Sequence, residues 1–357
     1  MPNAYPSTVT VNVGALSIED VVAVARYGAK VEIAPEALGE VAATRERVEE
    51  LAQDPTPVYG ISTGFGALAR RHIPEEMRAQ LQLSLVRSHA AGTGPEVEEE
   101  VIRALMLLRL STLCTGRTGV RPVVVETYAK ALNAGIVPVV REYGSLGCSG
   151  DLAPLAHCAL ALLGEGEVRV NGELQDAGDA LAAAGIEPLQ LREKEGLALI
   201  NGTDGMLGQL CLAITDLRAA AKTADIATAM TVEGLLGTLV VFADDLQQLR
   251  PHPGQADAAA NILQVAEGSE ILEAALEEFK KNQVQDAYSV RCAPQVAGGF
   301  RDTLAHTVQV AERELAAAVD NPVVTKDGRV VSNGNFHGAP VAYALDFLAI
   351  VTADLAS

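Results

Sequence analysis

Between Asp204 and Arg250 the chain runs for more than forty residues without a proline, and small or apolar residues fill most of this stretch. Proline is the residue that most strongly disrupts a helix, so its absence over such a length favours long helices. Helices of this kind bury their apolar surface by packing in a bundle. The segment Val296–Val319 has the same character. The sequence therefore predicts a mainly α fold, built on a long-helix bundle.

The composition also favours helices. Hydrophobic residues make up 49% of the 357 residues, yet aromatic residues supply only 4% and tryptophan is absent, so Ala, Leu and Val form the apolar mass. Ala and Leu are strong helix formers. The 27 basic and 46 acidic residues give a formal charge of −19, which repels phosphate backbones and anionic lipid. We therefore expect neither nucleic acid nor a membrane surface as a partner.

Local signals place several helices before the long ones. Ser17 precedes an apolar-periodic segment and predicts a helix start, while Pro122 predicts the start of another helix that Gly135 ends. Apolar residues at helical spacing predict a helix over Glu98–Cys114, and we expect one more after Asp151.

Small β-hairpins are expected around Asn171-Gly172 and Asp327-Gly328, because such pairs favour tight hairpin turns. No linker divides the chain, but its composition shifts, so we predict an N-terminal lobe over residues 1–195 and a long-helix core over residues 196–357. The segment Pro340–Ser357 is a helix without a glycine cap, a proline or a basic last turn. This predicts a core that is incomplete at the C-terminus of a truncated chain.

The five cysteines are an odd number without CxxC spacing, and the N-terminus lacks a basic-then-apolar signal pattern. Both features predict reduced thiols in a cytoplasmic protein. The longest apolar stretches, such as Ala156–Leu163 and Gly234–Ala243, fall short of the roughly 20 residues that cross a bilayer. We therefore expect a soluble protein.

The segment Gly144–His157 packs three glycines around Ser149 just before a predicted helix. One explanation is structural, a glycine-rich turn with Asp151 as the helix cap. A second is the nucleophile turn of a hydrolase, but the spacing is not G-x-S-x-G. His157 lies eight residues beyond Ser149 and fits the core of a helix better than a catalytic triad. No metal-ligand spacing or phosphate-binding loop rises above background.

Six further segments combine turn-forming residues with side chains that bind ligands or move protons. They are Tyr59–Gly66, Ser88–Gly92, Asn201–Thr203, Gln285–Gln295, Asp320–Pro322 and Asn333–Gly338. Taken singly, each has a structural explanation: a loop, a turn, a hydrogen-bonded histidine or a surface ion pair. Gln285, Tyr288 and Arg291 are spaced three apart, so one helical turn could align them.

Together, and in this order across almost the whole chain, the seven segments resemble the motifs of the aromatic amino acid ammonia-lyases. The resemblance implies that Cys148, Ser149 and Gly150 cyclise unaided into a 4-methylidene-imidazol-5-one ring, MIO. The amide nitrogen of Gly150 attacks the carbonyl carbon of Cys148, Ser149 loses its hydroxyl, and two waters leave. A glycine at the attacking position has no Cβ to block the approach. Most family members have Ala in place of Cys148, but the ring uses only the backbone of that residue.

The resemblance also implies catalytic and binding roles. Tyr59, as a phenolate, removes the β-proton of the substrate; since a phenol has a pKa near 10, the site must stabilise the anion. Asn201 lies beside the ring and the substrate amino group, and Tyr288 completes the catalytic set. The predicted N-terminal lobe carries both the Tyr59 loop and the MIO triad.

Four residues are expected to bind the substrate. His89 belongs to the Ser-His pair of the histidine-specific branch and hydrogen-bonds an imidazole. Arg291 grips the substrate carboxylate with two parallel hydrogen bonds, which its planar guanidinium suits. Phe336 closes over the ring, and Gln285 completes the group.

The expected activity is the conversion of L-histidine to trans-urocanate and ammonia, with MIO as the built-in cofactor and no diffusible one. We expect a homotetramer in which Tyr59 and Arg291 reach the ring from other subunits. The alternatives are another aromatic amino acid ammonia-lyase or an aminomutase, from which Ser88-His89 distinguishes it, and a catalytically impaired truncated scaffold. Family chains run beyond Ser357 and carry a further glutamate that reaches the substrate.

Overall fold

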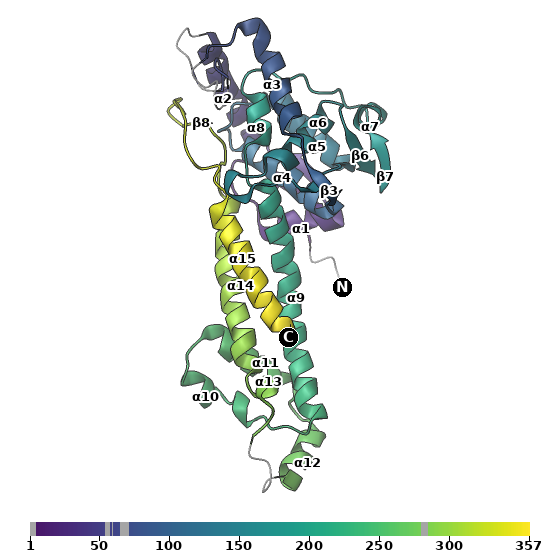
Figure 1. The fold of residues 1–357 in the computed structure, drawn as a ribbon, viewed down its shortest axis with the longest axis vertical. Helices are drawn as coiled ribbons and strands as arrows, with labels where there is room; N and C mark the ends of the chain where they lie inside the picture. The colour runs from purple at the N-terminus through teal and green to yellow at the C-terminus, as the bar shows by residue number, and fades with distance from the viewer. Residues whose placement is uncertain (1–4, 54–57, 59, 65–70, 280–284) are drawn as a thin grey trace. The chain divides into compact units, whose positions relative to one another are not determined.

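A computed structural model of the chain describes all residues except 1–4, 54–57, 59, 65–70 and 280–284. The chain forms two compact units (Figure 1). The first comprises Met1–Leu212 and Ala311–Ala342, and the second comprises Ala213–Val310 and Tyr343–Ser357. The predicted division at residues 195 and 196 stays a prediction.

The first unit begins with two short parallel strands, β1 (Thr8–Val11) and β2 (Lys30–Ile33), joined by helix α1 (Ile18–Tyr27). The prediction that Ser17 starts this helix is confirmed: its side chain accepts a hydrogen bond from the Asp20 amide, and the Asp20 carboxylate accepts one from the Ser17 amide. This reciprocal cap satisfies two amides that the first helical turn leaves free.

Helix α4 (Glu99–Cys114) is the centre of the first unit. Every residue from Ala104 to Cys114 is buried, and the helix contacts α1, α2 and α5. A helix whose central and C-terminal turns are mainly apolar on every side fits inside a protein. The remaining helices of this unit are α2 (Pro35–Gln53), α3 (Glu75–His89), α5 (Pro122–Asn133), α6 (Leu152–Leu162), α7 (Ala177–Ala183) and α8 (Glu195–Ile200).

Small antiparallel sheets cover parts of these helices. Strand β6 (Glu167–Val170) pairs with β4 (Ile136–Pro138) and with β7 (Glu173–Asp176). Asn171 and Gly172 join β6 to β7 with φ angles of 52° and 80°, as the expected two-residue turn requires. The other pairs are β3 (Thr93–Glu96) with β5 (Arg141–Tyr143), and β8 (Val323–Val324) with β9 (Val330–Val331) around Asp327-Gly328. Both predicted hairpins are confirmed.

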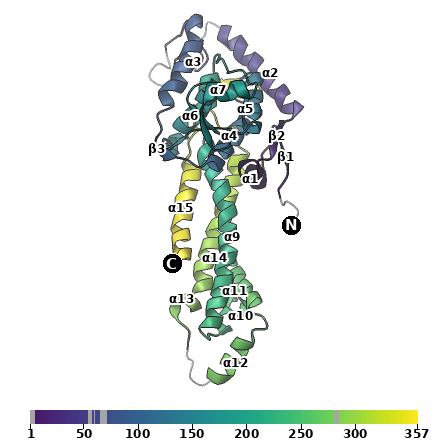
Figure 2. The same ribbon diagram turned by 90° about the vertical axis from the view of Figure 1, so that its right-hand side faces the viewer.

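The second unit is helical in its described residues. Its elements are the C-terminal part of α9 (Asp204–Gly234), the 3-10 turn η3 (Val240–Phe242), α10 (Asp244–Gln248), α11 (Pro253–Val265), α12 (Glu270–Phe279), α13 (Tyr288–Arg291), most of α14 (Ala293–Leu315) and most of α15 (Ala339–Ala356). Helices α9, α11 and α14 meet where Asp225 accepts hydrogen bonds from Asn261 and Arg301 (Figures 1 and 2). The prediction of a mainly α fold with small hairpins is confirmed.

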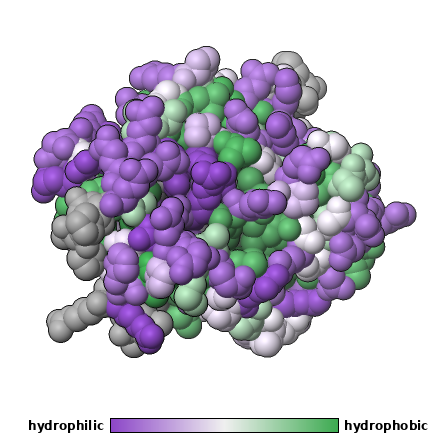
Figure 3. All heavy atoms as spheres, turned by 90° about the horizontal axis from the view of Figure 1, so that it is seen from above, coloured by the Kyte–Doolittle hydropathy of each residue, from purple (hydrophilic) through white to green (hydrophobic). Residues whose placement is uncertain are grey.

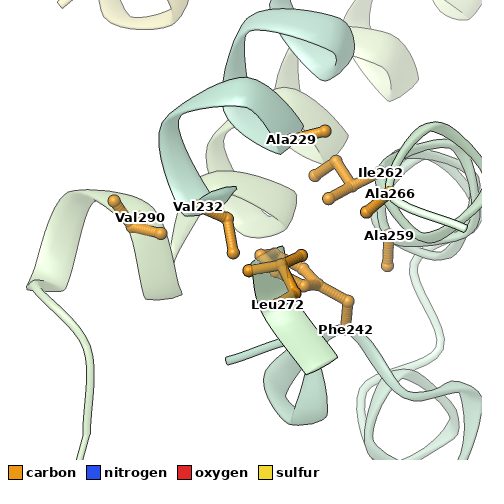
Figure 4. Packing of buried hydrophobic residues seen from close by; sticks show 8 residues of the cluster. All are labelled: Ala229, Val232, Phe242, Ala259, Ile262, Ala266, Leu272 and Val290. Atoms are coloured by element: carbon orange, nitrogen blue, oxygen red, sulfur yellow. The ribbon is translucent and has the colours of Figure 1, made fainter. Parts of the chain in front are cut away.

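The core of the second unit is a cluster of aliphatic side chains and one aromatic ring. Figure 4 shows these side chains converging from α9, η3, α11, α12 and α13. The buried members are Ala229, Val232, Phe242, Ala259, Ile262, Ala266, Leu272 and Val290. Small alanines let the helices approach closely while Phe242 fills the centre.

The proline-free stretch from Asp204 to Arg250 holds one long helix, α9, followed by the 3-10 turn η3 and the short helix α10, where several long helices were predicted. Helix α9 has 31 residues and stops at Gly234, because Leu236 takes a left-handed φ of 52°. The amides of Leu236 and Gly237 then bond back to the carbonyls of Glu233 and Val232. This is a Schellman cap, usually built on glycine, so a leucine in that position concealed the end of the helix.

Two described stretches are long and apolar enough to cross a membrane by length and composition alone, which corrects the expectation that every such stretch is too short. In Glu195–Gly234, 89% of the apolar window is buried within the protein, as in the core helix of a water-soluble protein. In Ala339–Ala356 the buried share is 17%. The face drawn in Figure 3 is mostly hydrophilic, with hydrophobic patches between polar side chains.

Candidate active site

The turn around Cys148 and Gly150 lies in the first unit and has a backbone that only glycine adopts easily. Residues Gly147–Ser149 form one 3-10 turn, η2, and Gly150 follows with φ 86° and ψ −171°. A Cβ on Gly150 would lie 2.6 Å from the carbonyl oxygen of Gly202. Both the φ angle and the lack of space exclude any side chain at this position.

Asp151, the next residue, holds this turn in place with hydrogen bonds to three other residues. Its fully buried carboxylate accepts a 2.5 Å hydrogen bond from the Ser145 hydroxyl and a 2.9 Å bond from the Met206 amide, and its own amide donates to Gly202. Burial raises the pKa of this carboxyl to about 6. Asp151 makes no capping bond to α6, so the interpretation of this residue as a simple helix cap is wrong.

Asn201 reaches the same turn from the end of α8. Its side-chain nitrogen donates to Asp320 Oδ1 at 3.3 Å and to the Asn321 carbonyl at 3.2 Å. Its backbone carbonyl accepts a 2.8 Å hydrogen bond from Arg109. The next residue, Gly202, lies against Gly150 and accepts a hydrogen bond from the Asp151 amide. Asn201 is therefore adjacent in sequence to a residue that contacts the Cys148–Gly150 turn.

The segment around Phe336 covers the turn from another side. The Gly338 amide donates a 3.0 Å hydrogen bond to the Cys148 carbonyl, and the Phe336 carbonyl lies 3.4 Å from the point where a Cβ on Gly150 would stand. Phe336 itself is half-buried and Cys148 is exposed. The fold therefore brings together three predicted motifs that lie far apart in the sequence.

His89 is the last residue of α3, and its ring is half-buried. Its Nδ1 lies 2.9 Å from the Leu85 carbonyl oxygen and 3.1 Å from Ser88 Oγ. A carbonyl oxygen only accepts, so Nδ1 carries the proton in the neutral ring and Nε2 remains an acceptor. The residue can thus receive a hydrogen bond from an imidazole N–H.

A second histidine, His157 on α6, supports the turn after His89. Its Nε2 accepts a 3.1 Å hydrogen bond from the Gly92 amide. Burial, aided by the positive charge of Arg141, lowers the pKa of His157 and keeps the ring neutral. The sequence identified His157 only as a core residue, because its partner lies 65 positions away.

Arg291, Tyr288 and Gln285 belong to the second unit. The Arg291 guanidinium carbon lies 5.7 Å from the centroid of the exposed Tyr288 ring, and Arg291 Nε is buried without a hydrogen-bond partner among the described residues. A buried donor of this kind suits an incoming carboxylate. Helix α13 begins at Tyr288, so the expectation that one helical turn aligns Gln285 with the other two is wrong.

Tyr59 lies outside the described residues, and so does the side chain of Ser149. The described residues contain no cluster of three or more His, Cys, Asp or Glu side chains that could hold a metal ion.

Sequence reasoning missed a group of buried charges behind the site. Arg109, Lys194 and Asp204 are almost entirely buried, and Arg109 lies 3.5 Å from Asp204. Arg109 is the one charged residue between Ala104 and Cys114 of α4, and a single charge in such a run is the one signal that could have indicated a buried polar network.

A family model described as aromatic amino acid lyase matches residues 16–357. The chain belongs to the aromatic amino acid lyase family, which uses MIO. It is 63% identical to a histidine ammonia-lyase of Streptomyces avermitilis over 351 residues, covering 98% of this chain and 68% of that one. It is 47% identical to a histidine ammonia-lyase of Gloeobacter violaceus, covering 96% of this chain and 66% of that one.

Solved structures confirm the fold. A tyrosine aminomutase from Streptomyces globisporus matches with a TM-score of 0.90 and 39% identity, covering 98% of this chain and 69% of that one. A histidine ammonia-lyase from Trypanosoma cruzi matches with a TM-score of 0.86 and 38% identity, covering 98% and 65%. The predicted ammonia-lyase type of helix bundle is therefore confirmed.

Proposed function

We propose that the protein removes ammonia from L-histidine without oxidation and forms trans-urocanate. The observation that carries this proposal is the 63% identity to a histidine ammonia-lyase across 98% of the chain. The neutral tautomer of His89, whose free Nε2 accepts a hydrogen bond, supports an imidazole substrate.

The built-in electrophile is a MIO ring formed from Cys148, Ser149 and Gly150. When present, such a ring supplies an electron-poor methylene that a substrate can attack, which makes elimination of the amine possible. The glycine turn supports this assignment, because its φ of 86° and the 2.6 Å approach to the Gly202 carbonyl oxygen require a residue without a Cβ at position 150. The hydrogen bonds of Asp151 hold the turn in place.

The chain's own side chains bind the substrate and move its proton. Arg291 of a neighbouring copy holds the carboxylate with its Nε–H, which has no partner among the described residues, and His89 orients the imidazole. Asn201 lies beside the amino group, and Tyr59 takes the β-proton. Tyr288 and Gln285 border the carboxylate, and Phe336 covers the ring side of the site.

We further propose a cytoplasmic homotetramer with shared active sites. The five cysteines are free, as expected in a reducing compartment. In helix α15, Tyr343, Phe347 and Ile350 follow one another at helical spacing, and their exposed fractions are 73%, 48% and 68%. Such an apolar stripe on the surface of one copy suits packing against another copy.

The test is a turnover assay with L-histidine, L-phenylalanine and L-tyrosine, following the ultraviolet absorbance of each product. We expect urocanate from histidine and no product from the other two. His89→Phe should abolish histidine turnover, because its Nε2 acceptor is lost, while the ring still forms. Arg291→Lys is the matched variant at the carboxylate end of the substrate, and it should weaken the binding of all three amino acids.

The matched structure of a tyrosine aminomutase makes an aminomutase the second candidate. Faster conversion of tyrosine or phenylalanine than of histidine would move the protein to that class. No product from any of the three, with the ring intact, would contradict the catalytic proposal.

A further inference from the structure

Asp320 touches both ends of helix α8 through its two carboxylate oxygens. Oδ2 lies 2.5 Å from the ammonium of Lys194, the residue before the helix, and Oδ1 accepts from Asn201, the residue after it. Lys194 and Asp320 are both fully buried in the first unit. One carboxylate thus links a buried cation to a residue of the proposed site.

This ion pair is an unusual element for a protein core. Removing both charges from water costs free energy that their attraction recovers only in part, so such a pair is weak grounds for stability. Burial lowers the pKa of Lys194, and the attraction of Asp320 opposes that change. Lys194 also takes a left-handed φ of 72°, a conformation that lysine rarely adopts. These costs indicate a role beyond packing.

The partners of Asn201 determine which way its amide faces. Asp320 Oδ1 and the Asn321 carbonyl oxygen both accept, so the atom between them is Nδ2, and its two hydrogens are used there. The other amide atom, Oδ1, is then the one that remains for a ligand. An acceptor at this position suits an ammonium group and repels an acceptor.

We propose that Lys194 and Asp320 are positioning residues, which orient the Asn201 amide so that its Oδ1 accepts a hydrogen bond from the amino group of the substrate. This inference rests on the proposed function, because Asn201 belongs to the proposed site. Lys194 holds the carboxylate, the carboxylate holds the amide nitrogen, and the short helix α8 fixes the distance between the two ends.

The key variant is Asp320→Asn, which keeps the shape but offers Asn201 an N–H group instead of an oxygen. The Asn201 amide then keeps only one of its two acceptors, the Asn321 carbonyl oxygen, and faces a donor at residue 320, so its Oδ1 is no longer held toward the substrate. We expect kcat per ring-containing site to fall by roughly 10²-fold, as for other misplaced site groups. The double variant Asp320→Asn/Asn201→Asp restores a donor–acceptor pair with residue 320 and an outward oxygen. It also turns an oxygen toward the Asn321 carbonyl, so it should recover only part of the loss.

Normalising the rate to the fraction of chains that carry the ring, measured by mass, separates orientation from folding. The matched control is Asp225→Asn, which breaks another buried ion pair, with Arg301, in the second unit. It should lower the melting temperature and leave kcat per ring-containing site unchanged. An unchanged kcat in Asp320→Asn, or no recovery in the double variant, would overturn the inference.

A binding measurement tests the same point without turnover. In a Ser149→Ala background, which cannot form the ring, calorimetry compares L-histidine with imidazole propionate, which lacks the amino group. We expect a preference for L-histidine that Asp320→Asn removes. A wild-type protein inactive on L-histidine would refute the proposed function. If the preference for L-histidine survives Asp320→Asn, the positioning role of Lys194 and Asp320 is refuted and the proposed function is not. If the Ser149→Ala protein shows no preference at all, the positioning role is also refuted.

Discussion

The two units differ in what their cores contain. The first unit buries charged side chains, including Arg109, Asp151, Lys194 and Asp320, and satisfies them mainly with hydrogen bonds and ion pairs. The core of the second unit is an aliphatic cluster around Phe242. Most of the exposed large hydrophobic side chains among the described residues belong to this second unit. Polar order is therefore concentrated around the proposed electrophile, whereas the helical unit offers apolar surface for assembly.

The largest expected effect is a change in the mass of the assembly when charges are placed on the apolar surface of the second unit. Phe347 on α15 and Met230 on α9 are both exposed. If the protein forms the proposed tetramer, Phe347→Glu/Met230→Glu should shift it to smaller species, because buried unpaired carboxylates are strongly unfavourable at an interface. Light scattering measures the mass of the assembly.

Leu174→Glu is the matched control. Leu174 is 50% exposed on strand β7 of the first unit. Its substitution should leave the assembly mass unchanged. A tetramer that survives the double substitution intact would show that these two side chains do not contribute to association.

The next largest effect is a loss of stability when the aliphatic core of the second unit is disrupted. Phe242 is 1% exposed in the middle of the aliphatic cluster. Phe242→Ala should lower the free energy of unfolding by about 3–5 kcal/mol, because it removes buried surface and leaves a cavity. Urea denaturation followed by circular dichroism measures the loss, and Phe242→Leu should cost less. A loss below about 1 kcal/mol would mean that the cluster collapses around the gap.

A smaller effect is expected on the pH dependence of stability, which depends on the buried carboxyl groups of the first unit. Asp151 has a pKa of about 6 in the folded protein, above that of an unfolded aspartate. Between pH 4 and pH 6 the folded state therefore holds more protons than the unfolded state, so this group lowers stability as pH rises through that window. The full effect is roughly 3 kcal/mol, from about two pKa units at 1.4 kcal/mol each.

The measurement is the difference in unfolding free energy between wild type and Asp151→Asn, at pH 7 and at pH 5. The variant should be less sensitive to the change of pH than the wild type. Burial also raises the pKa of Asp204 and Glu314, and the charge of Asp204 adds to the rise at Asp151. The difference between the two proteins therefore measures Asp151 together with its coupling to Asp204. Identical pH dependence in the two proteins would contradict the assignment to Asp151.

The sequence predicted those features that short-range chemistry determines. The Ser17 cap and the Asn171-Gly172 turn each depend on neighbours a few residues away, and both formed as expected. Motif order indicated the family, which the comparisons confirm. Cys148, Gly150 and Asn201 also lie together, although no single segment explains why.

The parts that could not be predicted depend on residues far apart or on unusual backbone angles. Lys194 and Asp320 are separated by 126 positions, so no local pattern connects them. The end of α9 rests on a left-handed Leu236 instead of a glycine. Asp151 looks like a helix cap in the sequence, but its oxygens are used by Ser145 and Met206.

We propose that the polar first unit forms and holds an electrophile made from Cys148, Ser149 and Gly150. Intact-protein mass spectrometry tests it most directly. The wild-type chain should be lighter than its encoded sequence by two waters, and Ser149→Ala should show no such loss. A wild-type chain at its full encoded mass would contradict the claim.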